Sequence, residues 1–191
     1  MAINLQKGQK INLGLTHMTV GLGWEPNEGT GFEFDLDVSA IMINDGRLIP
    51  AENFFIFYGN LTSPDGALEH TGDNPDGQGD GDDEESIIID LSKVDERIQE
   101  ILFVVTIDEY EARKQNFGQV RNSYIRLLDT AKNNEVVAIY ELDEDFSIET
   151  GVEFGRLYKR GGAWKFEASG IGYKEDLAFF LQKYYKGDII K

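Results

Sequence analysis

The strongest constraint on the fold is a run of alternating apolar and polar residues between positions 32 and 40. One face would carry Phe32, Phe34, Leu36, Val38 and Ala40, and the other Glu33, Asp35, Asp37 and Ser39. A period of two residues is the spacing of a β-strand, because successive side chains point to opposite faces of a sheet. The pattern therefore predicts a strand that presents Asp35 and Asp37 on the same face, roughly 6–7 Å apart.

Similar short segments follow one another along the chain and favour an all-β fold. Strand patterns occur twice within 3–15 and then at 20–24, 54–58, 87–89, 102–107, 123–128, 136–142, 153–159 and 163–168. Helical spacing predicts short helices at 93–100 and 176–185, and a helical turn is expected within 109–117, ended by Gly118. A parallel α/β sheet would need a helix after nearly every strand. We therefore expect a two-sheet β-sandwich of about ten strands with two or three short helices, formed by residues 1–191 as a single domain.

The charge balance narrows the classes of partner. The formal net charge is -17, and residues 65–85 contribute nine of the acidic side chains and no basic ones. Nucleic acid and anionic lipid attract basic proteins, so we expect neither nucleic-acid binding nor direct membrane insertion. The absence of cysteine excludes disulfides, zinc–thiolate sites and a thiol nucleophile. No signal-peptide core and no run of about 18 apolar residues is present, so a cytoplasmic location is expected.

The acidic segment from 71 to 85, TGDNPDGQGDGDDEE, is the strongest functional signal. It holds seven carboxylates and four glycines without any Lys or Arg. Charges packed at this density repel, so the segment is either a disordered insert or is ordered by a hard cation. The nearby Asp35 and Asp37 favour the second alternative, since no basic residue in the segment neutralises the converging acids. Flexible glycine carbonyls and bidentate carboxylates suit Ca²⁺ better than the smaller, octahedral Mg²⁺.

Known calcium motifs do not account for the segment. An EF-hand that began at Asp73 would place Glu84 correctly at its twelfth position, but Gln78 would stand where glycine is required. The calcium-binding nonapeptide repeat would need several copies, and one is present.

Catalysis has little support in the sequence. Asp35-x-Asp37 is also typical of metal-dependent phosphoryl or glycosyl transferases, which is the alternative function. However, the two histidines, His17 and His70, are not accompanied by a nucleophile motif. We therefore expect a protein that is not an enzyme, and we expect His70 to anchor the acidic segment.

Several segments in order along the chain resemble the tellurium-resistance TerD family. They are Gly21-Leu22-Gly23-Trp24, Phe34-Asp35-Leu36-Asp37-x-Ser39-Ala40, Phe55-Ile56-Phe57-Tyr58, the glycine-rich acidic stretch His70–Glu84, Phe103–Ile107, Phe117-Gly118-Gln119-Val120 and Trp164-Lys165-Phe166. The resemblance implies a β-sandwich that binds two Ca²⁺ ions, belongs to a stress-response system and has no established catalytic activity.

The resemblance also implies a ligand set. The ligands it assigns are Asp35, Asp37, Asp73, Asn74, the Gly77 carbonyl, Asp80, Asp82, Asp83 and Glu84. Pro75-Asp76 replaces the threonine usual in the family, so Asp76 is either an additional ligand or a charge beside the site. We expect calcium-dependent association with another stress-resistance protein or with a membrane-embedded partner.

Overall fold

The computed structural model describes residues 2–77, 83–142 and 145–187. The first sheet contains β1 (Ile3–Asn4), β3 (His17–Gly23), β6 (Leu68–His70), β7 (Glu85–Asp90), β9 (Tyr124–Asp129) and β10 (Glu135–Glu141). The second contains β2 (Lys10–Ile11), β4 (Leu36–Asn44), β5 (Phe55–Ile56), β8 (Ile98–Ile107), β11 (Gly151–Arg160), β12 (Ala163–Glu167) and β13 (Ile171–Tyr173). The helices are α1 (Tyr110–Arg113) and α2 (Leu177–Tyr184), with short 3-10 turns at Glu52–Phe54, Phe117–Gln119 and Thr130–Lys132.

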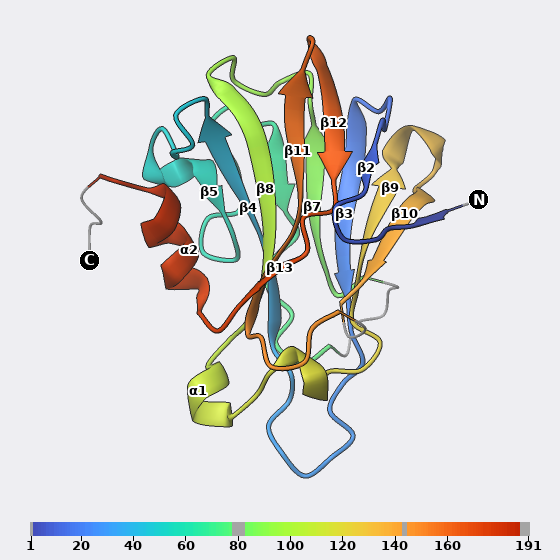
Figure 1. The fold of residues 1–191 in the computed structure, drawn as a ribbon, viewed down its shortest axis with the longest axis vertical. Helices are drawn as coiled ribbons and strands as arrows, with labels where there is room; N and C mark the ends of the chain where they lie inside the picture. Colours follow the sequence, from blue (N-terminus) through green and yellow to red (C-terminus); the bar gives the residue numbers. More distant parts are fainter. Residues whose placement is uncertain (1, 78–82, 143–144, 188–191) are drawn as a thin grey trace.

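The two sheets pack as layers around a shared apolar core (Figure 1). The order of the first sheet is β1-β10-β9-β3-β7-β6, and that of the second is β2-β12-β11-β8-β4-β5, with β13 paired to β11. This arrangement confirms the expected two-sheet β-sandwich. Strands β6 and β13 are additions to the predicted set, and both are three residues long.

The second sheet is buried on both faces at its centre. Strand β8 lies between β4 and β11, and its residues from Glu100 to Ile107 are buried. The first sheet covers one face, while α2 packs against the other with Phe180 and Tyr184 buried (Figure 1). The Ile49 backbone N–H donates to the Tyr184 carbonyl at 2.9 Å, which ties the end of the helix to the sheet. The predicted C-terminal helix is thereby confirmed.

The predicted helix at 93–100 is wrong. Residues 93–97 form turns, in which the Arg97 N–H donates to the Asp95 side chain at 2.9 Å, and Ile98 already begins β8. The helical spacing of apolar residues was overridden because β4 offers backbone partners along residues 98–107 and β11 along residues 100–106. Such partners lie far away in the sequence, so local spacing could not reveal them.

The predicted strand at 32–40 begins only at Leu36. Before it, the backbone is irregular and is held by side chains: Trp24 Nε1 donates to the Phe34 carbonyl at 3.0 Å, and Gln115 Nε2 donates to the Phe32 carbonyl at 2.9 Å. Phe32 is 65% exposed, contrary to the inward position that the alternation predicted. The polar face of β4 is buried, since Asp35 and Asp37 are only 8% and 3% exposed.

One other predicted strand is shorter than expected. The strand at 54–58 is reduced to β5, and Tyr58 is 42% exposed where burial on both faces was predicted. The helical turn predicted within 109–117 is present as the single turn of α1. No helix in the described ranges has the length and apolar character required to cross a membrane.

Candidate metal centre

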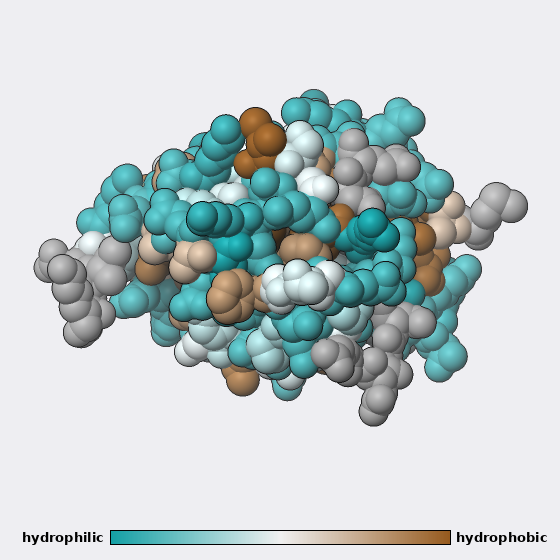
Figure 2. Space-filling view, turned by 90° about the horizontal axis from the view of Figure 1, so that it is seen from below, coloured by the Kyte–Doolittle hydropathy of each residue, from teal (hydrophilic) through white to brown (hydrophobic). Residues whose placement is uncertain are grey.

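Three carboxylates from two separate segments meet at one end of the sandwich. Asp35 and Asp37 flank the first residue of β4, and Asp73 lies in the segment that follows β6. One ligand oxygen from each lies within 4.8 Å of the others. The surface at this end is largely hydrophilic, with apolar residues set singly among the polar ones (Figure 2). Three oxygen donors at this spacing are a suitable core for a hard cation.

The segment that carries Asp73 is held against β4 by two buried side chains. His70 Nδ1 accepts from the Gly72 N–H at 3.0 Å, so its Nε2 carries the proton and donates to the Val38 carbonyl at 2.9 Å. Glu85 accepts from the Val38 N–H at 2.9 Å and from the Asn74 N–H at 3.2 Å. These bonds place Asp73, which lies between Gly72 and Asn74, beside Asp37. The predicted anchoring role of His70 is confirmed, whereas that of Glu85 was missed.

The geometry of β4 explains why side chains take this role. Strand β5 pairs only with Ala40 and Ile41, so the backbone groups of Val38 on that edge lie beyond its reach. Buried backbone groups require partners, and the imidazole of His70 and the carboxylate of Glu85 supply them.

Burial shapes the electrostatics of the cluster. Burial, followed by the neighbouring carboxylates of Glu85 and Asp35, raises the pKa of Asp37 to about 9. Burial also raises the pKa of Asp35 to about 6, although the Arg113 guanidinium acts in the opposite direction. Asp37 has no hydrogen-bond partner among the described residues. A bound cation would therefore stabilise the charged form of both side chains and displace their protons.

The expectation that no basic residue neutralises the acidic side chains is wrong, because two arginines lie beside them. Arg113 of α1 lies 3.3 Å from Asp35 Oδ2 and 2.9 Å from Glu109 Oε2. Arg126 of β9 lies 2.7 Å from Asp83 Oδ1. The expectation was based on neighbours in the sequence, whereas both arginines arrive from distant elements. They neutralise part of the charge.

Five of the remaining predicted ligands are described by the structure, namely Asn74, Asp76, Gly77, Asp83 and Glu84. Asn74 Nδ2 donates to Glu84 Oε2 at 2.7 Å, and the Asp76 backbone nitrogen lies 3.5 Å from Asn74 Oδ1. Asp83 pairs with Arg126 at 2.7 Å and is not one of the three carboxylates whose oxygens lie within 4.8 Å of one another. Asp80 and Asp82 lie outside the described residues.

Gly77 occupies a position that other residues would not fit. Its φ is +66°, and a Cβ atom there would lie 2.6 Å from the indole nitrogen of Trp24. Gly77 thus lies directly against Trp24, which is buried.

Comparison with known proteins places the chain in a family. The family model described as "TerD domain" matches residues 1–184. The chain is 47% identical to the uncharacterized protein YceE of Bacillus subtilis (strain 168), with 96% of this chain and 98% of that protein covered. It is 44% identical to the tellurium resistance protein TerD of Serratia marcescens, with 96% and 97% covered. General stress protein 16U of Bacillus subtilis (strain 168) is also 44% identical, with the same coverage.

A solved structure has the same fold. It is a homologue of the telluride resistance protein TerD from Streptomyces coelicolor A3(2), with a TM-score of 0.74, 19% sequence identity, and 88% of this chain and 96% of that chain covered. The sequence motifs, the two-sheet sandwich and the match across nearly the whole length agree. The chain belongs to the TerD domain family.

Proposed function

We propose that this protein is a calcium-binding stress-response protein that acts by binding other proteins rather than by catalysis. The observation that supports this best is the meeting of Asp35, Asp37 and Asp73, whose oxygens lie within 4.8 Å of one another. Two of the three are buried, and carboxylates are rarely buried without a counter-charge. The names of the relatives, which include tellurium resistance and general stress proteins, support the stress-response part of the proposal.

The donor set fits calcium. Asp35, Asp37 and Asp73 offer only oxygen, and the adjacent segment adds the side chains of Asn74 and Glu84. Calcium accepts six to eight oxygens in flexible geometry, whereas magnesium requires a near-octahedral arrangement. We propose two ions in total, for which the acidic segment up to Glu84, with Asp76, the Gly77 carbonyl, Asp80, Asp82 and Asp83, supplies the other candidate ligands. The ions would supply positive charge among the carboxylates, and the chain's residues would position them.

Calcium would make this end of the sandwich a regulated interaction surface. Two bound ions would change the formal net charge from -17 to -13, and the change would be concentrated in one place. A partner that contacts this surface would bind the calcium-free and the calcium-bound protein with different affinities. We propose that the partner is another stress-resistance protein, soluble or membrane-embedded.

Calorimetric titration of the chelator-stripped protein with CaCl₂ tests the proposal. We expect heat from binding in the wild-type protein and in Asp95→Asn, which removes an exposed carboxylate paired with Arg97 elsewhere on the surface. We expect the heat to be strongly reduced in Asp37→Asn. A wild-type protein that binds no calcium at micromolar concentrations would refute the cation site.

Pull-downs from a host lysate test the interaction part. Recovery of a partner should differ between calcium and EDTA. Equal recovery in both would mean that calcium does not control the association. Hydrolysis of generic phosphate esters with Mg²⁺, abolished by Asp35→Asn, would instead support the transferase alternative.

A further inference from the structure

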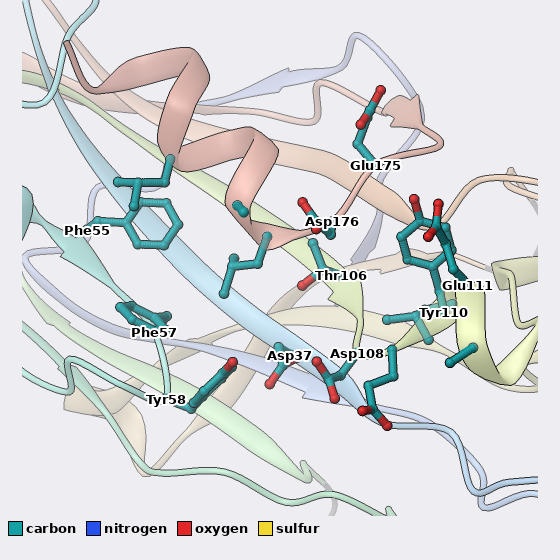
Figure 3. A pocket seen from close by; sticks show the side chains of 16 residues that line it. Asp37, Phe55, Phe57, Tyr58, Thr106, Asp108, Tyr110, Glu111, Glu175 and Asp176 are labelled. Atoms are coloured by element: carbon teal, nitrogen blue, oxygen red, sulfur yellow. The ribbon is translucent and has the colours of Figure 1, made fainter. Parts of the chain in front are cut away.

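A hollow of about 1010 Å³ opens beside the three-carboxylate cluster, on the face of the second sheet that α2 covers. Its walls come from the start of α2, the residues around β5, the end of β8 and α1 (Figure 3). Asp37 lines it and also belongs to the cluster. Pockets of this size usually hold ligands much larger than a metal ion.

The walls carry one sign of charge. Six acidic side chains line the hollow, namely Asp37, Asp108, Glu109, Glu111, Glu175 and Asp176, and no Lys, Arg or His within the described ranges lines it. Arg113 is paired with Glu109 at 2.9 Å and with Asp108 at 3.7 Å. Asp176 caps α2 by accepting from the Phe179 N–H at 3.0 Å. Glu111 and Glu175 form no ion pair with the described residues. The hollow therefore favours a cationic occupant.

At its inner end the hollow reaches a buried carboxylate. Asp37 is 3% exposed and has no hydrogen-bond partner among the described residues. Figure 3 shows its carboxylate close to that of Asp108, with the hydroxyl end of Tyr58 directed toward them. A buried acid of this kind is best satisfied by a donor that carries positive charge.

The other walls are apolar. Phe55, Phe57 and Tyr58 lie together on one side of the hollow (Figure 3). Leu177 and Leu181 of α2 also line it. The rings of Phe57 and Tyr58 meet edge to face at 5.2 Å, and Tyr58 is 42% exposed. Aromatic faces attract cations, and apolar walls accept the aliphatic stem of a long basic side chain.

We propose that the hollow of the calcium-free protein binds an arginine or lysine side chain, flanked by an apolar residue, from a segment of a partner protein. The acidic walls disfavour nucleic acid, and a second copy of a chain with a net charge of -17 is a poor source of positive charge. Because Asp37 belongs to both sites, calcium and the basic side chain compete for it. By linkage, each weakens the binding of the other by the same factor. Only this competition rests on the proposed calcium site.

The test uses the full chain in EDTA and a fluorescein-labelled hexapeptide with one arginine between leucine and phenylalanine. Fluorescence anisotropy should show binding that is about tenfold tighter than that of the same peptide with uncharged citrulline. The double variant Glu111→Gln/Glu175→Gln should lose about tenfold in affinity. The matched control Glu135→Gln/Glu141→Gln removes the same charge from β10, on the opposite side of the molecule, and should bind like wild type (Figure 1).

Equal affinity for the arginine and citrulline peptides, or equal losses in the two double variants, would overturn the proposal. Saturating calcium should weaken the binding of the arginine peptide, and simultaneous binding without mutual effect would overturn the shared use of Asp37. Calorimetry with calcium alone separates the two proposals. Peptide binding without calcium binding would refute the cation site only, and calcium binding without peptide binding would refute the hollow as a basic-peptide site.

Discussion

At the scale of single residues, Asp37 is a proposed calcium ligand whose burial lowers the stability of the folded protein. Its carboxylate is buried without a described hydrogen-bond partner, and burial raises its pKa to about 9. At neutral pH a raised folded-state pKa means that the folded protein holds a proton that the unfolded chain would release, so folding is penalised there. Residues kept for binding often carry such a penalty in stability.

The first prediction concerns Asp37→Asn. Removing the ionisable group should stabilise the metal-free protein on the order of 1 kcal/mol and raise its Tm by about 2–4 °C. The same substitution should abolish most of the rise in Tm that calcium produces. Differential scanning calorimetry in EDTA and in calcium measures both effects. A variant less stable than wild type in EDTA would show that Asp37 already has a stabilising partner in the metal-free fold.

Arg113 is the second residue with a predictable role. Its guanidinium lies 3.3 Å from Asp35 and so supplies positive charge where calcium is proposed to bind. Arg113→Gln should therefore increase calcium affinity about tenfold, because the ion no longer competes with a resident charge. Arg97→Gln, which breaks an exposed pair with Asp95, changes the net charge equally and should leave the affinity unchanged. Similar titration curves for all three proteins would exclude this role.

At the scale of elements, the important contact joins β4 to the segment after β6. The Val38 N–H donates to the Glu85 carboxylate, and the Val38 carbonyl accepts from His70. Glu85 also accepts from the Asn74 N–H. The position of Asp73 thus depends on buried side chains that need not touch the ion. Residues of this kind commonly control metal affinity as strongly as some ligands do.

Glu85→Gln tests this contact. The amide can accept only one of the two backbone N–H bonds with its oxygen, so the variant should lose about 1–3 kcal/mol of unfolding free energy. It should also bind calcium about 10–100-fold more weakly, because Asp73 is less well held. Urea unfolding and calorimetry provide the two measurements. Glu69→Gln, on the exposed face of β6, is the matched control and should resemble wild type in both.

At the scale of the whole molecule, calcium and folding should be linked. The protein has a formal net charge of -17, and the seven carboxylates of residues 71–85 lie close together in the sequence and repel one another. An ion that binds only the folded form adds about 2.7 kcal/mol per site at a hundred times its dissociation constant. Thermal melts in calcium should therefore lie several degrees above melts in EDTA, and magnesium should have a smaller effect. Coincident melts would indicate that the segment is an acidic insert without a role in stability.

The sequence by itself determined the fold class, most of the strands and the acidic residues of the candidate site. Strand periodicity and turn residues are local signals, and they located β9, β10, β11, β12 and α2 within a few residues. The acidic side chains of 71–85 and the same-face pair Asp35 and Asp37 were also visible, because charge density and a two-residue period need no tertiary contact. The resemblance to the TerD family rested on these same segments.

The tertiary structure alone decided what surrounds the carboxylates. Residues 98–100 belong to the predicted helix 93–100, yet they join β8, where β4 pairs from Ile98 and β11 from Glu100. Arg113 meets Asp35 across 78 positions in the sequence, and Glu85 meets Val38 across 47. The acidic hollow likewise combines residues 37, 108–111 and 175–176. Sequence patterns report which face of an element is apolar, whereas charges from distant elements are brought together only when the sheets pack.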